Sequence, residues 1–168
     1  MPTAAHLFER HHLAVFRFLR RMGLPQADAE DLTQDVFLRI VQALPSYEER
    51  ESERAWVFRI ARNLRLDRWR ASGRAPATEP LGEEKVVAIA AARVDALAIE
   101  QALGRLGEAE REALVMREVG GLSYAEIAEA TGATPDAVRS RIHRARLFLR
   151  RTLGGARRPS RAGAGREA

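Results

Sequence analysis

The chain of 168 residues has no cysteine, and its only lysine is Lys85. Without cysteine it can form no disulfide framework, no thiolate zinc site and no thiol nucleophile. No apolar run approaches the ~18 residues that a membrane-spanning helix needs. The charged N-terminus lacks the apolar core of a secretory signal. These absences predict a cytoplasmic protein without membrane insertion.

Aromatic residues are also scarce and unevenly distributed. They make up 6% of the chain, and eight of the ten lie before residue 70. Positive charge is carried almost entirely by arginine, with a net charge of +5. A basic balance favours nucleic acid or another anionic partner. The abundance of Ala, Leu, Arg and Glu favours helices, and the length allows one ordinary domain or two small ones.

The stretch Gly121–Leu153 contains the signals of two consecutive helices. Ser123 followed by Glu126 is a capping box. Thr134 before Pro135 predicts a second helix start, and Gly132 between them suits the left-handed residue that ends a helix. A short helix, a tight turn with glycine and a longer basic helix are typical of a helix-turn-helix.

The second of these helices has an apolar stripe and an arginine-rich face. At about 100° per residue, Val138, Ile142, Ala145 and Leu149 fall on one narrow side. The opposite side carries Arg139, Ser140, His143, Arg144, Arg146 and Arg150. The guanidinium group of arginine can donate two hydrogen bonds to O6 and N7 of guanine in the major groove of duplex DNA. A merely solvated amphipathic helix is the alternative, but the capped helix and turn before it favour DNA reading.

At the N-terminus a first helix is expected over Ala4–Met22, ended by Gly23. Its histidines His6, His11 and His12 suggest a metal site. However, His11 and His12 are adjacent and cannot share a helix face. We therefore expect no metal here and assign these histidines to the surface.

The next helix is expected to start at Asp28, with Asp31 completing a capping box, and to end at Pro45. A helical period is formed by Leu32, Val36, Phe37, Ile40, Val41 and Leu44. Its outward side is acidic, with Asp28, Glu30, Asp31 and Asp35 around Gln34. Acids in a first turn stabilise the helix dipole, which explains part of the cluster. A basic protein partner explains the excess better.

A third helix, expected over Arg54–Ala71 after the acidic loop Ser46–Glu53, combines arginines with aromatic rings. We expect Val57, Ile60, Ala61 and Leu64 to be buried. The opposite face carries Arg59, Arg62, Leu66, Trp69 and Arg70, with Asn63 and Trp56 at its margins. Cations beside flat rings suit the phosphates and unstacked bases of single-stranded nucleic acid. Core packing is the alternative for Trp56 and Phe58.

The rest of the chain is divided by composition. Residues 72–95, rich in Pro and Gly at first, are expected to be a flexible linker, with a helix beginning near Val86. The second domain, 96–153, is expected to contain helices over Ala96–Leu106 and Glu108–Val119 before the helix-turn-helix. Residues 154–168 form a Gly-, Ala- and Arg-rich tail that we expect to be disordered and basic. The predicted fold class is all-α, with a three-helix domain (1–71) and a four-helix domain.

Three stretches carry a family resemblance: ADAEDLTQDVFLRIVQAL, RAWVFRIARNLRLDRWR, and the segment from LGRLGEAEREALVMREVGG to the end of the helix-turn-helix. They resemble regions 2 and 4 of bacterial RNA polymerase sigma factors, over about residues 5–71 and 96–153. The lack of a central domain is similar to the extracytoplasmic-function (ECF) class of the sigma-70 family. One departure is TPDA at Thr134–Ala137, where the family often has Pro-Val-Gly-Thr, so a threonine contact to phosphate does not carry over to Ala137.

The resemblance implies roles for the residues that match. Residues expected to dock on the clamp helices of the largest polymerase subunit are Asp31, Gln34, Asp35 and Phe37. Residues expected to recognise and melt the minus-ten element are Tyr47, Trp56, Arg59, Arg62, Asn63, Trp69 and Arg70. Residues expected to read the minus-thirty-five element are Arg139, Ser140, His143, Arg144 and Arg146. Further implied partners are the flap of the second-largest subunit, duplex and single-stranded promoter DNA, and an anti-sigma factor, with nucleoid association when active.

These features predict a transcription initiation factor that recruits polymerase and melts DNA, without enzymatic activity or a cofactor. The sequence lacks a Walker A motif and a plausible Ser/His or paired-carboxylate site. One rival is a two-domain regulator with a sensor domain before the helix-turn-helix. Another is a small helical DNA-processing enzyme that uses Asp28, Asp31 and Asp35 with a divalent metal.

Overall fold

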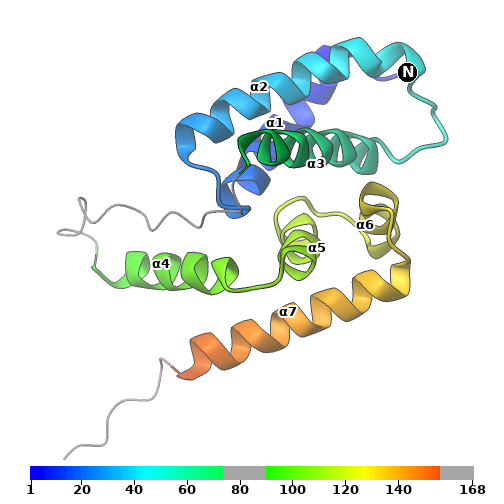
Figure 1. The fold of residues 1–168 in the computed structure, drawn as a ribbon. Coiled ribbons are helices and arrows are strands. Elements are labelled where there is room, and N and C mark those ends of the chain that lie inside the picture. Colours follow the sequence, from blue (N-terminus) through cyan, green and yellow to red (C-terminus); the bar gives the residue numbers. More distant parts are fainter. Residues whose placement is uncertain (74–89, 156–168) are drawn as a thin grey trace, which may run out of the picture.

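The structure of this protein, a computed structural model, describes residues 1–73 and 90–155, with side chains from residue 96 onward in the second range. All regular structure in these ranges is helical, which confirms the all-α prediction (Figure 1). The first domain consists of α1 (Ala4–Arg21), α2 (Gln26–Ala43), the short 3-10 helix η1 (Leu44–Ser46) and α3 (Glu53–Ser72). The second consists of α4 (Ala90–Gly104), α5 (Glu108–Glu118), α6 (Tyr124–Thr131) and α7 (Pro135–Gly155).

The ends of α1 and α3 follow from local chemistry. Thr3 caps α1 by accepting a hydrogen bond from the backbone N–H of His6, and Ser52 caps α3 by accepting one from Ala55. Gly23, at a φ of +97°, turns the chain after α1, in a region that favours glycine. The predicted spans of these two helices are therefore confirmed to within one or two residues.

The predicted start of α2 is wrong. The helix begins at Gln26, with Pro25 at the N-cap and no side-chain cap bond, so Asp28 and Asp31 form no capping box. Proline fixes φ and needs no hydrogen bond for its missing N–H, so it can define a helix start by itself. Val41, which belongs to the apolar period of this helix, lies 55% exposed on its outer side.

The helix-turn-helix is built as its sequence predicts. Ser123 and Glu126 make both bonds of the capping box, Gly132 is left-handed at a φ of +71°, and Thr134 accepts a 3.1 Å hydrogen bond from the N–H of Ala137. The predicted stripe on α7 is buried at Val138, Ile142 and Ala145 and partly buried at Leu149. The turn thereby fixes how the outer face of α7 is presented.

The predicted linker and tail are only partly covered by the structure. Residues 74–89, including the helix start expected near Val86, and residues 156–168 lie outside the described residues. The first helix of the second domain starts at Ala90, six residues before the predicted Ala96, and α7 continues to Gly155. The domain boundaries themselves stay a prediction.

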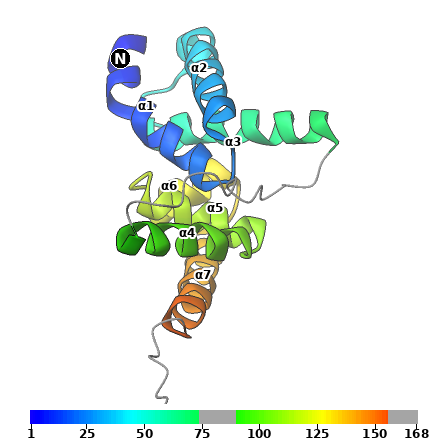
Figure 2. The ribbon, with the colours of Figure 1, turned by 90° about the vertical axis from the view of Figure 1, so that its left-hand side faces the viewer.

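Helix α3 has α1 and α2 on one side and the helices of the second domain on the other (Figures 1 and 2). The two domains share one continuous hydrophobic cluster. In it the rings of Phe18 and Phe58 meet edge to face, with their centroids 5.5 Å apart. Val57 and Ala61 are buried as predicted, but Phe58 and Arg65 are buried too. Ile60 and Leu64 of the predicted stripe are partly buried and pack against the same core. The additional burial of Phe58 and Arg65 arises because α5 and α6 cover a second side of this helix.

Candidate polymerase and nucleic-acid interfaces

An acidic face runs along the exposed side of α2. Asp31, Gln34 and Asp35 are exposed, and their spacing of three and four residues places them on one side of the helix. Leu38 and Val41 continue this side and are 62% and 55% exposed. Carboxylates followed by free apolar side chains form a surface suited to a protein partner.

Two contacts modify this face. Asp35 forms a 3.0 Å ion pair with Arg68 of α3, which is exposed at both ends and therefore contributes little to stability. Phe37 is buried, and its ring meets Phe8 edge to face at a centroid distance of 5.0 Å. Phe8 is itself 46% exposed. Phe37 is therefore mainly a core residue, and the ring that packs against it, Phe8, is the one that is partly exposed.

Two of the aromatic residues predicted to meet the minus-ten element are packed inside the first domain. Tyr47 and Trp56 are 8% and 5% exposed, and their ring centroids are 4.8 Å apart. The Tyr47 hydroxyl donates a 3.0 Å hydrogen bond to the Glu51 carbonyl. Burial, together with nearby carboxylates such as Glu53, raises the pKa of Tyr47. In this arrangement both rings are core residues, so stacking on DNA bases would require the loop before α3 to move.

The other residues predicted for the same element divide into two groups. Asn63 and Arg70 are exposed, Trp69 is partly buried, and Arg59 is paired with Glu51 at 3.2 Å within its own domain. Arg62, in contrast, forms an ion pair with Glu112 of α5 in the second domain. Its neighbour Arg65, which the sequence did not single out, pairs with Glu108 and Glu112. The structure thus brings part of the predicted DNA surface against carboxylates.

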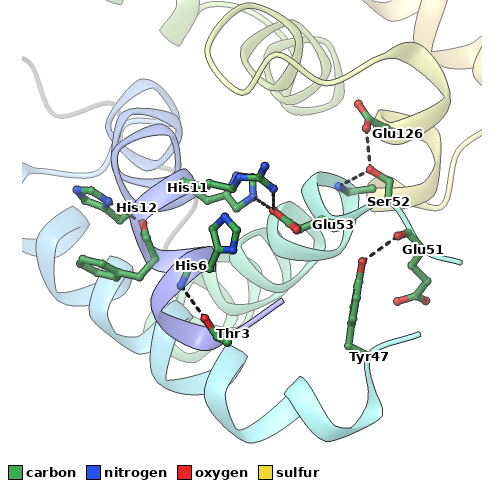
Figure 3. A network of polar contacts seen from close by, with 12 residues as sticks. Thr3, His6, His11, His12, Tyr47, Glu51, Ser52, Glu53 and Glu126 are labelled. Carbon is green, nitrogen blue, oxygen red and sulfur yellow. Dashed lines mark hydrogen bonds and ion pairs between the residues drawn. The ribbon is translucent and has the colours of Figure 1, made fainter. Parts of the chain in front are cut away.

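A polar network surrounds the start of α3 (Figure 3). His11 Nε2 lies 2.7 Å from a Glu53 carboxylate oxygen, and Arg10 donates to the same oxygen at 3.2 Å. Burial acts to raise the pKa of Glu53, but the hydrogen bonds from His11 and Arg10 outweigh it and hold that pKa below its ordinary value. The surface role predicted for His11 is wrong, because this side chain is buried against Glu53.

The other two histidines have separate surroundings. His6 is exposed, while His12 stacks on Phe8 with ring centroids 4.5 Å apart. Among the described residues, no group of three or more His, Cys, Asp or Glu side chains is arranged to hold a metal ion.

The predicted DNA-reading residues of α7 are all exposed. Arg139 pairs with Asp136 at 2.9 Å, Arg144 with Glu110 at 3.3 Å and Arg146 with Glu118 at 2.7 Å. The hydrogen bond that Arg146 donates to Glu118 is the main reason that the pKa of Arg146 is raised. Exposed pairs of this kind exchange easily for phosphate or base contacts. Ser140 and His143 lie between them on the same exposed side.

Tyr124, the first residue of α6, is an additional part of this surface. The guanidinium carbons of Arg117 and Arg139 lie 5.2 and 5.7 Å from its ring centroid, within cation–π range. A shallow depression beside it is lined by Tyr124, Arg139, His143 and Arg146, among others. A lone tyrosine after a capping serine gives no sequence signal for this arrangement.

Comparison with known families matches both halves of the chain. Residues 7–75 match the family model described as Sigma-70 region 2, and residues 96–149 match Sigma-70, region 4. The chain is 36% identical over 149 residues to the ECF RNA polymerase sigma factor SigM of Mycobacterium tuberculosis, covering 88% of this chain and 76% of SigM. The chain belongs to the ECF class of the sigma-70 family.

Other relatives extend the likeness of this sigma factor. This chain is 35% identical to the ECF RNA polymerase sigma factor SigE of Mycolicibacterium smegmatis. The match covers 89% of this chain but only 61% of SigE. The structure of CnrH in complex with the cytosolic domain of CnrY is 31% identical and has a TM-score of 0.72, covering 90% of this chain and 88% of CnrH. A structure of RpoE with the anti-sigma factor NepR from Bartonella quintana, 23% identical with a TM-score of 0.72, shares the fold.

The two matched family regions correspond to the two sets of helices in the structure. Helices α1–α3 form region 2 of this sigma factor and α4–α7 form region 4. Region 2 therefore occupies the position where the rival hypothesis required a sensor domain. Within the described ranges, no helix has the length and apolar character needed to cross a bilayer.

Proposed function

We propose that this sigma factor binds core RNA polymerase through α2, directs it to promoters through α7 and helps to melt them with α3. The observation that carries the proposal is the separation of two unlike surfaces in one chain. Helices α2 and α7, which carry these two surfaces, lie at opposite ends of the described part of the molecule (Figures 1 and 2). One end suits a basic protein partner, and the other suits DNA.

On the polymerase side, Asp31, Gln34 and Asp35 supply charge and hydrogen bonds, and we add Leu38 and Val41 as the apolar contacts of the same surface. Free apolar side chains of this size contribute about 1.5–3 kcal/mol each when they are fully buried at an interface. The clamp helices of the largest polymerase subunit are the proposed partner of this face. The flap of the second-largest subunit is the proposed partner of region 4.

On the DNA side, α7 reads the duplex and α3 stabilises the separated strand. Arg139, His143 and Arg144 would meet base edges and phosphates of the minus-thirty-five element. Near the minus-ten element, Asn63 and Arg70 are already exposed, whereas Tyr47 and Trp56 need the loop to open. Flipping a base costs a few kcal/mol, and stacking on a ring returns ~1–3 kcal/mol, so binding alone supports melting without hydrolysis.

An anti-sigma factor is a further proposed partner. It is supported by the complex of the RpoE relative with NepR. That relative is similar in fold over 89% of this chain. Co-purification with this sigma factor should identify the corresponding partner.

The proposal is tested by reconstitution. Core polymerase with this protein should give promoter-specific transcripts from a library of fragments of the source genome, while core polymerase alone should not. Stable binding to core polymerase without DNA should accompany it. Absence of any promoter-specific transcript from the whole library would overturn the proposal.

A further inference from the structure

The outward face of α7 carries a single acidic residue, Asp136, among its arginines. The helix contains no other Asp or Glu from Pro135 to Gly155. At about 100° per residue, Asp136 lies about 160° from the buried Val138 and within about 40° of Ser140 and His143. These three exposed residues form one row along the middle of the outward side. A carboxylate in this row repels the phosphates of DNA, so another contact has to explain its position.

Asp136 holds the guanidinium group of Arg139. Arg139 Nη1 donates a 2.9 Å hydrogen bond to Asp136 Oδ1. The Asp136 side chain is 90% exposed, and a carboxylate can accept about four hydrogen bonds. Its carboxylate therefore remains accessible to a further donor. The pair presents a donor group and an acceptor group side by side.

A second contact holds Arg139 from outside α7. Arg139 Cζ lies 5.7 Å from the centroid of the Tyr124 ring, within cation–π range. Tyr124 is the first residue of α6, and the capping box at Ser123 fixes the start of that helix. Arg139 is thus held by a carboxylate of its own helix and by a ring of the preceding one. This reduces the side-chain freedom that Arg139 loses when it binds a base.

The Asp136–Arg139 pair differs from the other ion pairs of α7. The carboxylates that pair with Arg144 and Arg146 belong to α5 and do not move with α7. Asp136 and Arg139 are three residues apart on one helix, so they enter a DNA groove together. They also lie at the start of α7, and the N-terminal residues of a recognition helix are the ones that contact base edges.

We propose that Asp136 is a specificity-determining residue of the minus-thirty-five contact. One carboxylate oxygen directs Arg139 toward O6 and N7 of a guanine, and the accessible oxygen accepts a hydrogen bond from the N4 amino group of a neighbouring cytosine. Thymine and guanine offer only acceptors at the edge of the major groove, and adenine places its N7 acceptor beside its amino group. Cytosine is therefore the base that fits Asp136. The inference rests on the proposed function of α7 in reading duplex DNA.

The test removes the charge of Asp136 and measures base preference. Holoenzyme assembled from core polymerase and the full chain is bound to promoter duplexes randomised in the minus-thirty-five element, and the bound DNA is sequenced. The wild type should enrich cytosine next to a guanine. Asp136→Asn should lower this cytosine enrichment about tenfold, within the range that a mismatched base pair costs. Because Asn pairs with adenine, adenine should rise at the same position.

The matched control is Glu129→Gln, on the exposed side of α6, which makes the same change in net charge and should keep the wild-type preference. A carboxylate at a helix start also stabilises the helix dipole. If that were the whole role of Asp136, Asp136→Asn would alter the affinity for all duplexes equally. An unchanged base preference in Asp136→Asn would therefore overturn the inference.

A second variant tests whether the two residues read neighbouring bases. Arg139→Ala should remove the guanine preference at the base pair next to the one where Asp136→Asn loses cytosine. Loss of the two preferences at base pairs that are not adjacent would overturn the inference. A wild-type holoenzyme that enriches no minus-thirty-five sequence would count against the proposed function itself, whereas enrichment that does not depend on Asp136 overturns this inference alone.

Discussion

At the scale of single residues, Gly120 is required by a close approach between the domains. A Cβ atom added there would lie 2.7 Å from the Met116 carbonyl oxygen and 2.9 Å from Phe58 Cζ, distances that the backbone cannot relieve cheaply. We expect Gly120→Ala to lower the free energy of unfolding by about 1–3 kcal/mol, measured by urea denaturation. Gly154→Ala, where a Cβ meets nothing within 4 Å, should show no loss. Equal stabilities of the two variants would contradict this account.

Glu53 should make stability depend on pH. A carboxyl whose pKa is lowered on folding contributes stability above its ordinary pKa, and that contribution is lost as the pH falls through the lowered value. We expect Glu53→Gln to cost about 1 kcal/mol at neutral pH, the difference between a charge-assisted and a neutral hydrogen bond. The gap from wild type should close below about pH 4. Urea unfolding across pH tests this.

The control for that series is Glu48→Gln, in the exposed loop before α3. It should track the wild type at every pH. A gap between Glu53→Gln and wild type that persists at the lowest pH would show that the Glu53 contribution does not come from its ionisation.

At the scale of elements, α2 and α7 should be separable by substitution. Asp35→Arg reverses the charge of the polymerase-facing side and should abolish co-elution with core polymerase in gel filtration while sparing duplex DNA binding. Because Asp35 also pairs with Arg68, Arg68→Gln is the control: it breaks the same pair without reversing the face, and should retain polymerase binding.

The reciprocal change is Arg144→Ala in α7. It should weaken binding to a minus-thirty-five duplex by about 1–3 kcal/mol if the arginine contacts guanine through both nitrogens, and leave polymerase binding unchanged. Arg151→Ala, exposed near the end of the same helix, should change duplex affinity much less. Loss of the same activity in Asp35→Arg and Arg144→Ala would contradict the proposed division between α2 and α7.

At the scale of the whole molecule, the shared core should couple the two domains. Phe58 is fully buried and touches both Phe18 and the Gly120 region of the second domain. Phe58→Ala should cost about 3–5 kcal/mol and increase hydrogen exchange in α5 and α6 as well as in α3. Phe37→Ala removes a ring of the same size from α2, and its effect should stay within the first domain. Equal effects of the two variants on α5 would contradict the coupling.

Much of the fold followed from patterns that act within one or two helical turns. The caps at Ser123 and Thr134 involve partners three residues apart, and the left-handed conformation of Gly132 depends on the residue type itself. These features could therefore be predicted directly from the sequence. The start of α2 was misplaced because Asp28 satisfies the same local rule as a true cap. The exposure of Val41 could not be predicted from its sequence, because the helical period of α2 does not reveal where the packing partners of the helix end.

The candidate sites divide in the same way. The sequence by itself determined the helices, the family and the arginine face of α7, because periodicity, caps and charge are local properties. Only the tertiary structure decided that Tyr47 and Trp56 are core residues and that Arg62 and Arg65 face Glu112 and Glu108. The residues of these ion pairs are 43 and 50 residues apart in the chain, and Ser52 is 74 residues from its hydrogen-bond partner Glu126. Which carboxylate meets which arginine at that separation depends on how the domains pack, and no local pattern encodes it.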